Sequence, residues 1–139
     1  MSADVAPAHL ARLREVADAA RANAWCPYSR FPVGAALETD DGRIFAGCNV
    51  ENASYPAGTC AERVALGTAI AAGARSFVRV VITSAVSEPT PPCGICRQAL
   101  VEFAPALEVF AVTPDGRWIR WSLAELLPAP FTPASLENA

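Results

Sequence analysis

Residues 77–112 read FVRVVITSAVSEPTPPCGICRQALVEFAPALEVFAV and contain the pattern from which the type of sheet is predicted. Valine and isoleucine dominate residues 77–84, as in a strand that is buried on both faces. A proline-rich loop leads to a helix predicted over residues 94–103, and residues 107–112 are predicted to form a second strand. Because a strand, a helix and a strand in succession usually form a crossover connection, the two strands are predicted to lie parallel in one sheet.

A helix, a hairpin and a second helix are predicted before this segment. Apolar side chains near the start of the chain recur at three- and four-residue steps, which is the period of an amphipathic helix. Two extended runs flank Asp40-Asp41-Gly42, a strong hairpin signal, and an alanine- and leucine-rich helical run is ended by Gly73. The predicted elements are a helix from residue 7 to about residue 24, strands at residues 33–39 and 43–50, and a helix at residues 60–72.

The end of the chain is predicted to add one more strand and a short helix. Pro114-Asp115-Gly116 forms a turn into a strand over residues 117–121. Ser122 and Glu125 have the spacing of a capping box, in which each side chain accepts a hydrogen bond from the other residue's backbone N–H. The order of elements predicts an α/β fold, a three-layer α/β/α single domain (1–139) with a mixed five-stranded sheet.

The composition limits which binding partners and which cellular compartment are expected for the protein. The 139 residues fit one domain, and 53% hydrophobic with 18% charged residues leave apolar surface that subunit interfaces can cover. A formal net charge of -3 supplies no cationic field for duplex nucleic acid. No run approaches the roughly 20 apolar residues of a membrane span, so no membrane partner is predicted. Five cysteines without an apolar leader favour the reducing cytoplasm.

The basic residues exclude several catalytic mechanisms. All 11 basic side chains are arginine, so mechanisms that use a Schiff-base lysine or a phosphate-loop lysine are excluded. The single histidine, His9, belongs to the predicted N-terminal helix and is far in sequence from the motifs below. It is predicted to be a solvated helix residue, which disfavours a serine or cysteine nucleophile activated by histidine.

Cysteine opens two of the predicted helices, and this pairing is the strongest chemical signal in the chain. Cys60-Ala61-Glu62 begins one helix, and Pro92-Cys93-Gly94-Ile95-Cys96 begins the other. A helix N-terminus presents free N–H groups and a partial positive charge, both of which favour a thiolate. Cys93 and Cys96 lie one helical turn apart, so both sulfurs can bind one metal ion, with Cys60 as a third ligand.

Three protein ligands favour a catalytic Zn²⁺ site with one ion per subunit. They leave the fourth tetrahedral position of zinc open, unlike the ligands of a closed structural site, and zinc in such a site lowers the pKa of water toward about 7. Three thiolates oppose this effect because they cancel the charge of the ion. Arg63 and Arg97 each follow a motif directly, and hydrogen bonds from them to the sulfurs are predicted to restore the Lewis acidity.

Glu62 is the predicted catalytic residue because its carboxylate can face the metal site without ligating the ion and can shuttle protons there. A structural alternative is a capping box formed with Thr59. Cys26 and Cys48 lie outside the motifs and are predicted to be small buried apolar side chains. An alternative of another class also stays open: a zinc-stabilised structural or binding module in which Cys26 or Cys48 supplies a fourth ligand.

These motifs resemble those of the small homotetrameric cytidine deaminases, the three-cysteine branch of the zinc deaminases. The likeness extends over nearly the whole chain and implies a cytidine deaminase-like fold. Ile95, between the paired ligands, is bulkier than the family pattern. Beyond the cysteine motifs, the resembling segments are residues 28–36, 47–55 and 125–131.

The resemblance implies the reaction and the residues that bind its substrate. The expected reaction is zinc-dependent hydrolysis of cytidine, deoxycytidine or both to the uridine product and ammonia, as in pyrimidine salvage. Asn49 and Glu51 match positions that hydrogen-bond the ribose, and Phe31 matches an aromatic wall beside the base. The backbone of Ala61, together with Glu62, matches the group that contacts the pyrimidine edge.

The resemblance also implies an assembly. Tyr55 and Phe131 match positions that reach into the active site of a neighbouring subunit, so a homotetramer with composite active sites is expected. A deaminase of aminonucleoside antibiotics of the blasticidin type shares the Cys-Ala-Glu and Pro-Cys-Gly-x-Cys motifs and stays open as an alternative. Residues 49–55 favour the cytidine deaminases over it, and the choice between cytidine and deoxycytidine stays open.

Overall fold

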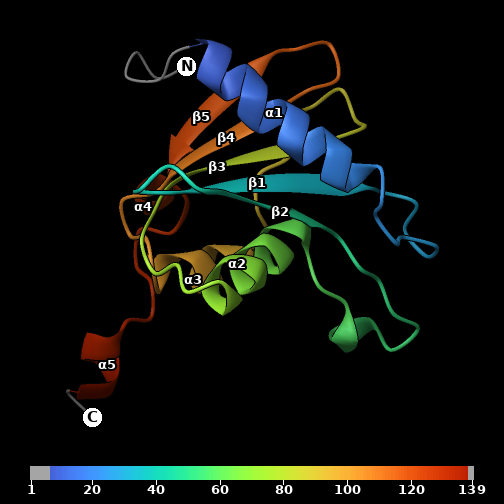
Figure 1. The fold of residues 1–139 in the computed structure, drawn as a ribbon. Coiled ribbons are helices and arrows are strands. Elements are labelled where there is room, and N and C mark those ends of the chain that lie inside the picture. The colour runs from blue at the N-terminus through green and yellow to red at the C-terminus, as the bar shows by residue number, and fades with distance from the viewer. Residues whose placement is uncertain (1–6, 138–139) are drawn as a thin grey trace.

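One mixed sheet forms the centre of the structure, a computed structural model that describes residues 7–137. Its five strands are β1 (Val33–Thr39), β2 (Ile44–Cys48), β3 (Phe77–Ser84), β4 (Glu108–Val112) and β5 (Trp118–Ser122). They lie in the order β2-β1-β3-β4-β5 (Figure 1). The pair β3 and β4 is parallel, which confirms the predicted crossover, and the other neighbours are antiparallel.

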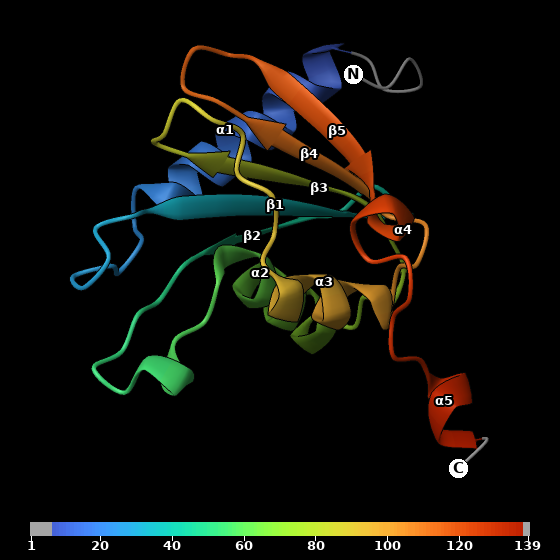
Figure 2. The same cartoon turned by 180° about the vertical axis from the view of Figure 1, so that it is seen from behind.

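Helices cover both faces of this sheet, which confirms the predicted three layers. The helix α1 (Pro7–Arg21) lies on one face, and α2 (Ala61–Ala71) and α3 (Gly94–Val101) lie on the other (Figures 1 and 2). Leu10 and Leu13 of α1 belong to a buried cluster with Phe110 of β4. A larger cluster, which includes Leu66 of α2 and Leu100 of α3, fills the space on the opposite face.

Three further helices are short: η1 (Tyr55–Ala57), α4 (Leu123–Leu126) and α5 (Pro133–Glu137). The predicted capping box is present at the start of α4, where Glu125 N donates to Ser122 Oγ (3.1 Å) and Ser122 N donates to Glu125 Oε1 (3.2 Å). The helices η1 and α5 were not predicted, and α5 lies apart from the three layers in both views (Figures 1 and 2). Each helix within residues 7–137 is too short or too polar to cross a lipid bilayer.

A row of charged side chains crosses the α1 face of the sheet and includes His9. The imidazole of His9 contacts the carboxylate of Glu38, which is only 4% exposed. Glu38 also contacts Arg79, and Glu108 then links Arg79 (3.5 Å) to Arg120 (2.8 Å). His9 lies in a helix as predicted, but its half-buried side chain is not simply solvated. It contacts Glu38 because a buried carboxylate requires charged or hydrogen-bonding partners.

Gly47 allows α2 to pack closely against β2, and this contact positions the start of α2. A Cβ atom on Gly47 would lie 2.3 Å from the carbonyl oxygen of Ala61 and 2.4 Å from the backbone nitrogen of Ala65. Both atoms belong to the backbone of α2, so they cannot move without the helix. The absence of a side chain at Gly47 therefore sets the distance between the sheet and the cysteine-bearing end of α2.

We expect Gly47→Ala to lower the free energy of unfolding by about 3 kcal/mol, because the added methyl group must push α2 away from β2. Gly67→Ala is the matched control: Gly67 lies within α2, and a Cβ atom there has no neighbour within 4 Å. Alanine in a helix interior is favoured over glycine by about 1 kcal/mol, so this control should be neutral or stabilised. Equilibrium urea unfolding measures both changes, and equal stabilities would contradict this account.

Candidate metal centre and active site

Three cysteine sulfurs meet where α2 and α3 begin. Cys60 and Cys93 are the N-cap residues of the two helices, and Cys96 lies in the first turn of α3. The three sulfurs lie within 4.8 Å of one another, with Cys60 Sγ and Cys93 Sγ 3.7 Å apart. Tetrahedral ligands with Zn–S bonds of about 2.3 Å place their sulfurs about 3.8 Å apart, so the spacing fits one zinc ion.

The protein environment favours a thiolate at Cys60. Its pKa is lowered to about 5, chiefly by a hydrogen bond from Cys96, with further contributions from Arg63 and Cys93. The same contact with Cys60, together with burial, raises the pKa of the Cys96 thiol. Metal ligands must be deprotonated, so a cation that binds both sulfurs displaces the proton of Cys96.

Glu62 lies in the first turn of α2, buried beside the sulfurs. Glu62 is only 5% exposed, and this burial raises the pKa of its carboxyl group to about 7. The alternative structural role is not observed, because the N-cap of α2 is Cys60 and no side chain caps this helix. The carboxyl group of Glu62 is therefore poised to hold or release a proton near neutral pH.

A cavity of about 340 Å³ opens over Cys60, Cys93 and Glu62, and Cys96 lies outside its lining. This volume lies within the usual range for sites that bind small molecules. Seven residues predicted for the site line it: Phe31, Asn49, Glu51, Cys60, Ala61, Glu62 and Cys93. Segments that are far apart in the sequence are therefore brought to one cavity.

Comparison with known proteins identifies the family. Residues 8–112 match the family described as "Cytidine and deoxycytidylate deaminase zinc-binding region". The chain belongs to this family. A cytidine deaminase of Sporosarcina psychrophila is 41% identical over 86% of this chain and 89% of its own length. The crystal structure of cytidine deaminase from Burkholderia pseudomallei is 48% identical, covers 87% of this chain and 98% of its own, and has a TM-score of 0.83.

The fold extends to a further member of this deaminase family. The crystal structure of cytidine deaminase from Mycobacterium tuberculosis is 37% identical, covers 88% of this chain and 96% of its own, and has a TM-score of 0.76. The matched family region includes all three cysteines of the metal centre. The predicted cofactor, zinc, and the predicted three-cysteine site are therefore confirmed.

The two arginines that follow the deaminase motifs are placed differently. Arg63 Nη2 donates to Cys60 Sγ at 3.7 Å, as expected. The guanidinium of Arg97 instead donates to the carbonyl oxygens of Pro92 and Leu126, both at 2.8 Å. The prediction that Arg97 bonds to sulfur is corrected, because its side chain is taken up by backbone acceptors that lie beside α3. Arg97 thereby ties the loop before Cys93 to the end of α4.

We expect Arg63→Ala to weaken zinc binding by about 10- to 100-fold, because the sulfur of Cys60 loses a charge-assisted hydrogen bond. Arg75→Ala is a suitable control, since Arg75 donates to the carbonyl oxygens of Ile70 and Ala74 at the far end of α2. Competition with a chromogenic zinc chelator measures both affinities. Equal zinc affinity in Arg63→Ala and the unsubstituted protein would contradict a role for Arg63 at the metal centre.

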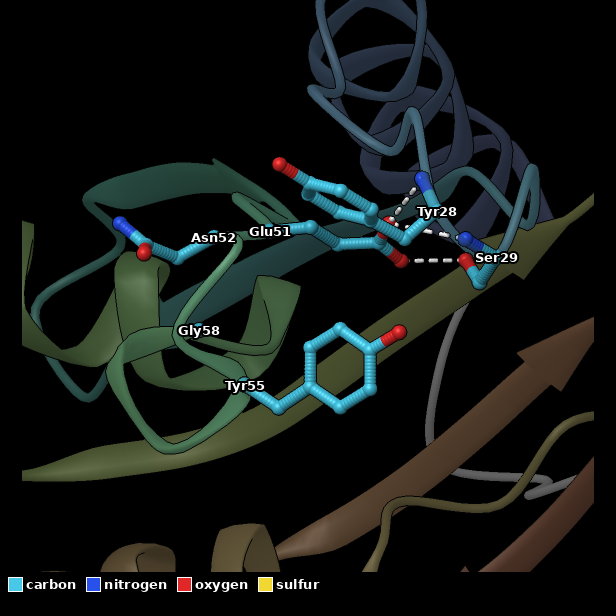
Figure 3. A pocket seen from close by; sticks show the side chains of 6 residues that line it. All are labelled: Tyr28, Ser29, Glu51, Asn52, Tyr55 and Gly58. Atoms are coloured by element: carbon cyan, nitrogen blue, oxygen red, sulfur yellow. Dashed lines mark hydrogen bonds between the residues drawn. The ribbon is translucent and has the colours of Figure 1, made fainter.

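Tyr55 and Phe131 do not line the cavity over the sulfurs. Tyr55 borders a neighbouring cavity of about 360 Å³, where its ring lies 6.0 Å from that of Tyr28 in an edge-to-face arrangement (Figure 3). Phe131 is held through its backbone, which exchanges two hydrogen bonds with the side chain of Gln98. Both rings are open to solvent, with Tyr55 76% and Phe131 59% exposed.

Several residues of the cavity were missed by sequence reasoning. They come from the loop before β1, from β1 and β3, and from the loop before α3. Ser29 and Val33 lie within residues 28–36, a segment that resembles the family, and Thr90 and Pro91 lie just before Cys93, so neighbouring motifs offered a signal for these four. Ile82 lies outside the motifs, within the apolar run of the predicted strand at residues 77–84. The missed lining residues are Ser29, Val33, Ile82, Thr90 and Pro91.

Proposed function

We propose that this chain catalyses the hydrolytic deamination of cytidine, deoxycytidine or both to the corresponding uridine product with release of ammonia. The observation that carries the proposal is the buried carboxyl of Glu62, with its pKa near neutrality, in the same cavity as the three-sulfur zinc site. The cytidine deaminases of known sequence and structure that this chain resembles support the choice of substrate. The expected setting is nucleoside salvage in the cytoplasm.

The chemistry divides between the metal and the side chains of the cavity. Zinc held by Cys60, Cys93 and Cys96 would supply Lewis-acid activation of water. Glu62 takes one proton of water to ring N3 as the oxygen bonds to C4. It then takes the second proton to the departing amine as the C4–N bond breaks, so that ammonia leaves and C4 keeps the oxygen. A single buried carboxyl group with a pKa near 7 suits both transfers.

The remaining cavity residues are proposed to bind and orient the nucleoside. Phe31 packs against the base, and the backbone of Ala61 contacts the pyrimidine edge beside Glu62. Asn49 and Glu51 hydrogen-bond the sugar hydroxyls. Their position in one cavity with the sulfurs supports these assignments.

We extend the proposal to a homotetramer in which Tyr55 and Phe131 complete the site of a neighbouring subunit. Their exposure supports this role, since large aromatic side chains gain most from burial at an interface. Sedimentation of the purified protein measures the assembly, and a fully active monomer would exclude composite sites.

The assay for the proposed function is ammonia release by the purified zinc-loaded protein from cytidine, deoxycytidine and blasticidin S, each supplied alone. We expect turnover of one or both pyrimidine nucleosides and none of blasticidin S. Turnover of blasticidin S alone would favour the antibiotic deaminases, which share the cysteine motifs. Absence of ammonia with all three substrates would refute deamination as the activity.

A further inference from the structure

The peptide of Phe31 is held by side chains on both sides. Phe31 N donates to Ser29 Oγ at 3.1 Å, and Phe31 O accepts from Asn49 Nδ2 at 2.8 Å. The same Asn49 side chain accepts from Val33 N at 2.8 Å through Oδ1. Asn49 therefore fixes the backbone on one side of the aromatic ring, and the hydroxyl of Ser29 fixes it on the other.

Ser29 also holds the carboxylate of Glu51. Glu51 Oε1 accepts from the backbone nitrogens of Tyr28 and Ser29, both at 3.0 Å, and Glu51 Oε2 accepts from Ser29 Oγ (Figure 3). A hydroxyl group has one proton to donate and lone pairs to accept. The hydroxyl of Ser29 gives its proton to Glu51 and accepts from Phe31 N, so it connects the two residues directly.

The residue between these two contacts has a strained backbone. Arg30 has a φ of 55°, the one positive value for a non-glycine residue within residues 7–137. Such a conformation is sparsely populated for residues with a Cβ atom and persists where the surroundings enforce it. Arg30 N donates to Cys26 O at 2.9 Å, and the contacts of Ser29 and Phe31 hold the residues on either side.

We propose that Ser29 is a positioning residue for substrate binding, whose hydroxyl locks the aromatic wall of Phe31 and the carboxylate of Glu51 into one arrangement before the nucleoside enters. The inference rests on the proposed function only in taking a cytosine nucleoside as the occupant of the cavity. Ser29 lines the cavity over the sulfurs as well as the neighbouring cavity bounded by Tyr55. A loop that is ordered in advance need not lose its conformational entropy when the ligand binds, which strengthens binding.

The hydrogen-bond capacity of Glu51 allows this lock and the substrate to coexist. A carboxylate offers about four acceptor positions. Tyr28 N, Ser29 N and Ser29 Oγ occupy three of them. One position stays free for a sugar hydroxyl, so Glu51 binds the nucleoside without releasing Ser29.

The kinetic test compares Ser29→Ala, Ser29→Thr and the control Ser76→Ala, an exposed serine just before β3. We expect Ser29→Ala to raise KM for cytidine about tenfold with kcat within about twofold, because the lock acts on binding and not on proton transfer. Ser29→Thr keeps a hydroxyl and should restore KM. An unchanged KM in Ser29→Ala, a loss confined to kcat, or a KM that Ser29→Thr fails to restore would overturn the proposal.

A second measurement needs no substrate and separates this inference from the proposed function. Amide hydrogen exchange of residues 28–33 in the zinc-loaded protein should be about tenfold faster in Ser29→Ala than in Ser76→Ala, because the loop loses its lock. Unchanged exchange would overturn the inference even if cytidine is turned over. Faster exchange in a protein that turns over neither cytidine nor deoxycytidine would refute the proposed function and leave the positioning role of Ser29 supported.

Discussion

Glu62→Gln is expected to lower kcat for cytidine by about a thousandfold while one zinc ion per chain is retained. Glutamine has nearly the shape of glutamate but cannot accept and return a proton. The metal centre consists of three cysteine sulfurs that lie within 4.8 Å of one another, and Glu62 is not one of its ligands. The substitution therefore leaves the metal centre complete. Steady-state kinetics and zinc analysis of the same purified sample measure both parts of this expectation.

Glu102→Gln is the matched control for this substitution. Glu102 is the exposed C-cap of α3 and is not among the residues that line the cavity. The control should keep full activity. If Glu62→Gln kept more than about a tenth of the activity, proton transfer by Glu62 would be refuted, because general acid–base catalysis contributes at least about a hundredfold.

The same variant should be more stable than the unsubstituted protein once zinc is removed. The pKa of Glu62 is raised from 4.5 to about 7 by burial, so the folded metal-free protein holds a proton that the unfolded chain releases. The free energy of unfolding therefore falls as the pH rises between these two values. At pH 8 the ionisation of buried Glu62 lowers the free energy of unfolding by about 3 kcal/mol, and below pH 4.5 this destabilisation vanishes.

Unfolding of the two metal-free proteins at pH 4 and pH 8 measures this difference. Glu62→Gln has no charge to bury, so its stability advantage should appear only at the higher pH. An equal difference at both pH values would show that packing, and not charge burial, separates the two proteins. A catalytic residue that destabilises the fold in this way is consistent with a position kept for its chemistry.

Sequence reasoning located the sheet and the main helices because their signals are local. The apolar runs of β3 and β4 and the helical run between them are sufficient to predict a parallel crossover. The end of α1 was misplaced because its cause is tertiary. The alanine-rich pattern continues to residue 24, yet Trp25 N donates to Asn49 O and Trp25 O accepts from Glu51 N, so the chain must leave the helix to reach this segment.

The site shows the same division between local and tertiary causes. Two cysteine-opened helices predict the metal centre, since each motif is contiguous and its thiolates suit a helix N-terminus. The fate of Arg97 depends on the carbonyl of Leu126, which is 29 residues away, and local spacing holds no information on that contact. The linking position of Ser29, between Glu51 and Phe31, likewise exists only after the loop has folded against β2 and the segment that follows it.

Cys96→Ala is expected to reduce bound zinc to less than about a tenth of one ion per chain, because two remaining sulfurs bind zinc far more weakly than three. Cys96 is the buried member of the cluster, whereas Cys93 is exposed. Loss of Cys96 leaves the sulfurs of the half-buried Cys60 and the exposed Cys93. Metal analysis after dialysis measures the zinc content, and turnover of cytidine should be lost with it.

Cys26→Ala and Cys48→Ala are the matched controls, because both residues lie outside the three-sulfur cluster found within residues 7–137. Each control should retain one zinc ion and full activity. Loss of zinc from either would instead support a closed four-cysteine site, which belongs to a structural module and leaves no position for catalysis. The comparison therefore separates the enzyme from the module by metal content alone.

Thermodynamic stability provides a second measurement of the effect of Cys96→Ala. A ligand that binds only the folded state stabilises it by about 4 kcal/mol when its concentration is a thousand times its dissociation constant. Added zinc should therefore raise the unfolding midpoint of the metal-free protein and of both controls, and leave that of Cys96→Ala unchanged. Equal stabilisation of all four proteins would place the zinc elsewhere, and with it the chemistry assigned to Glu62.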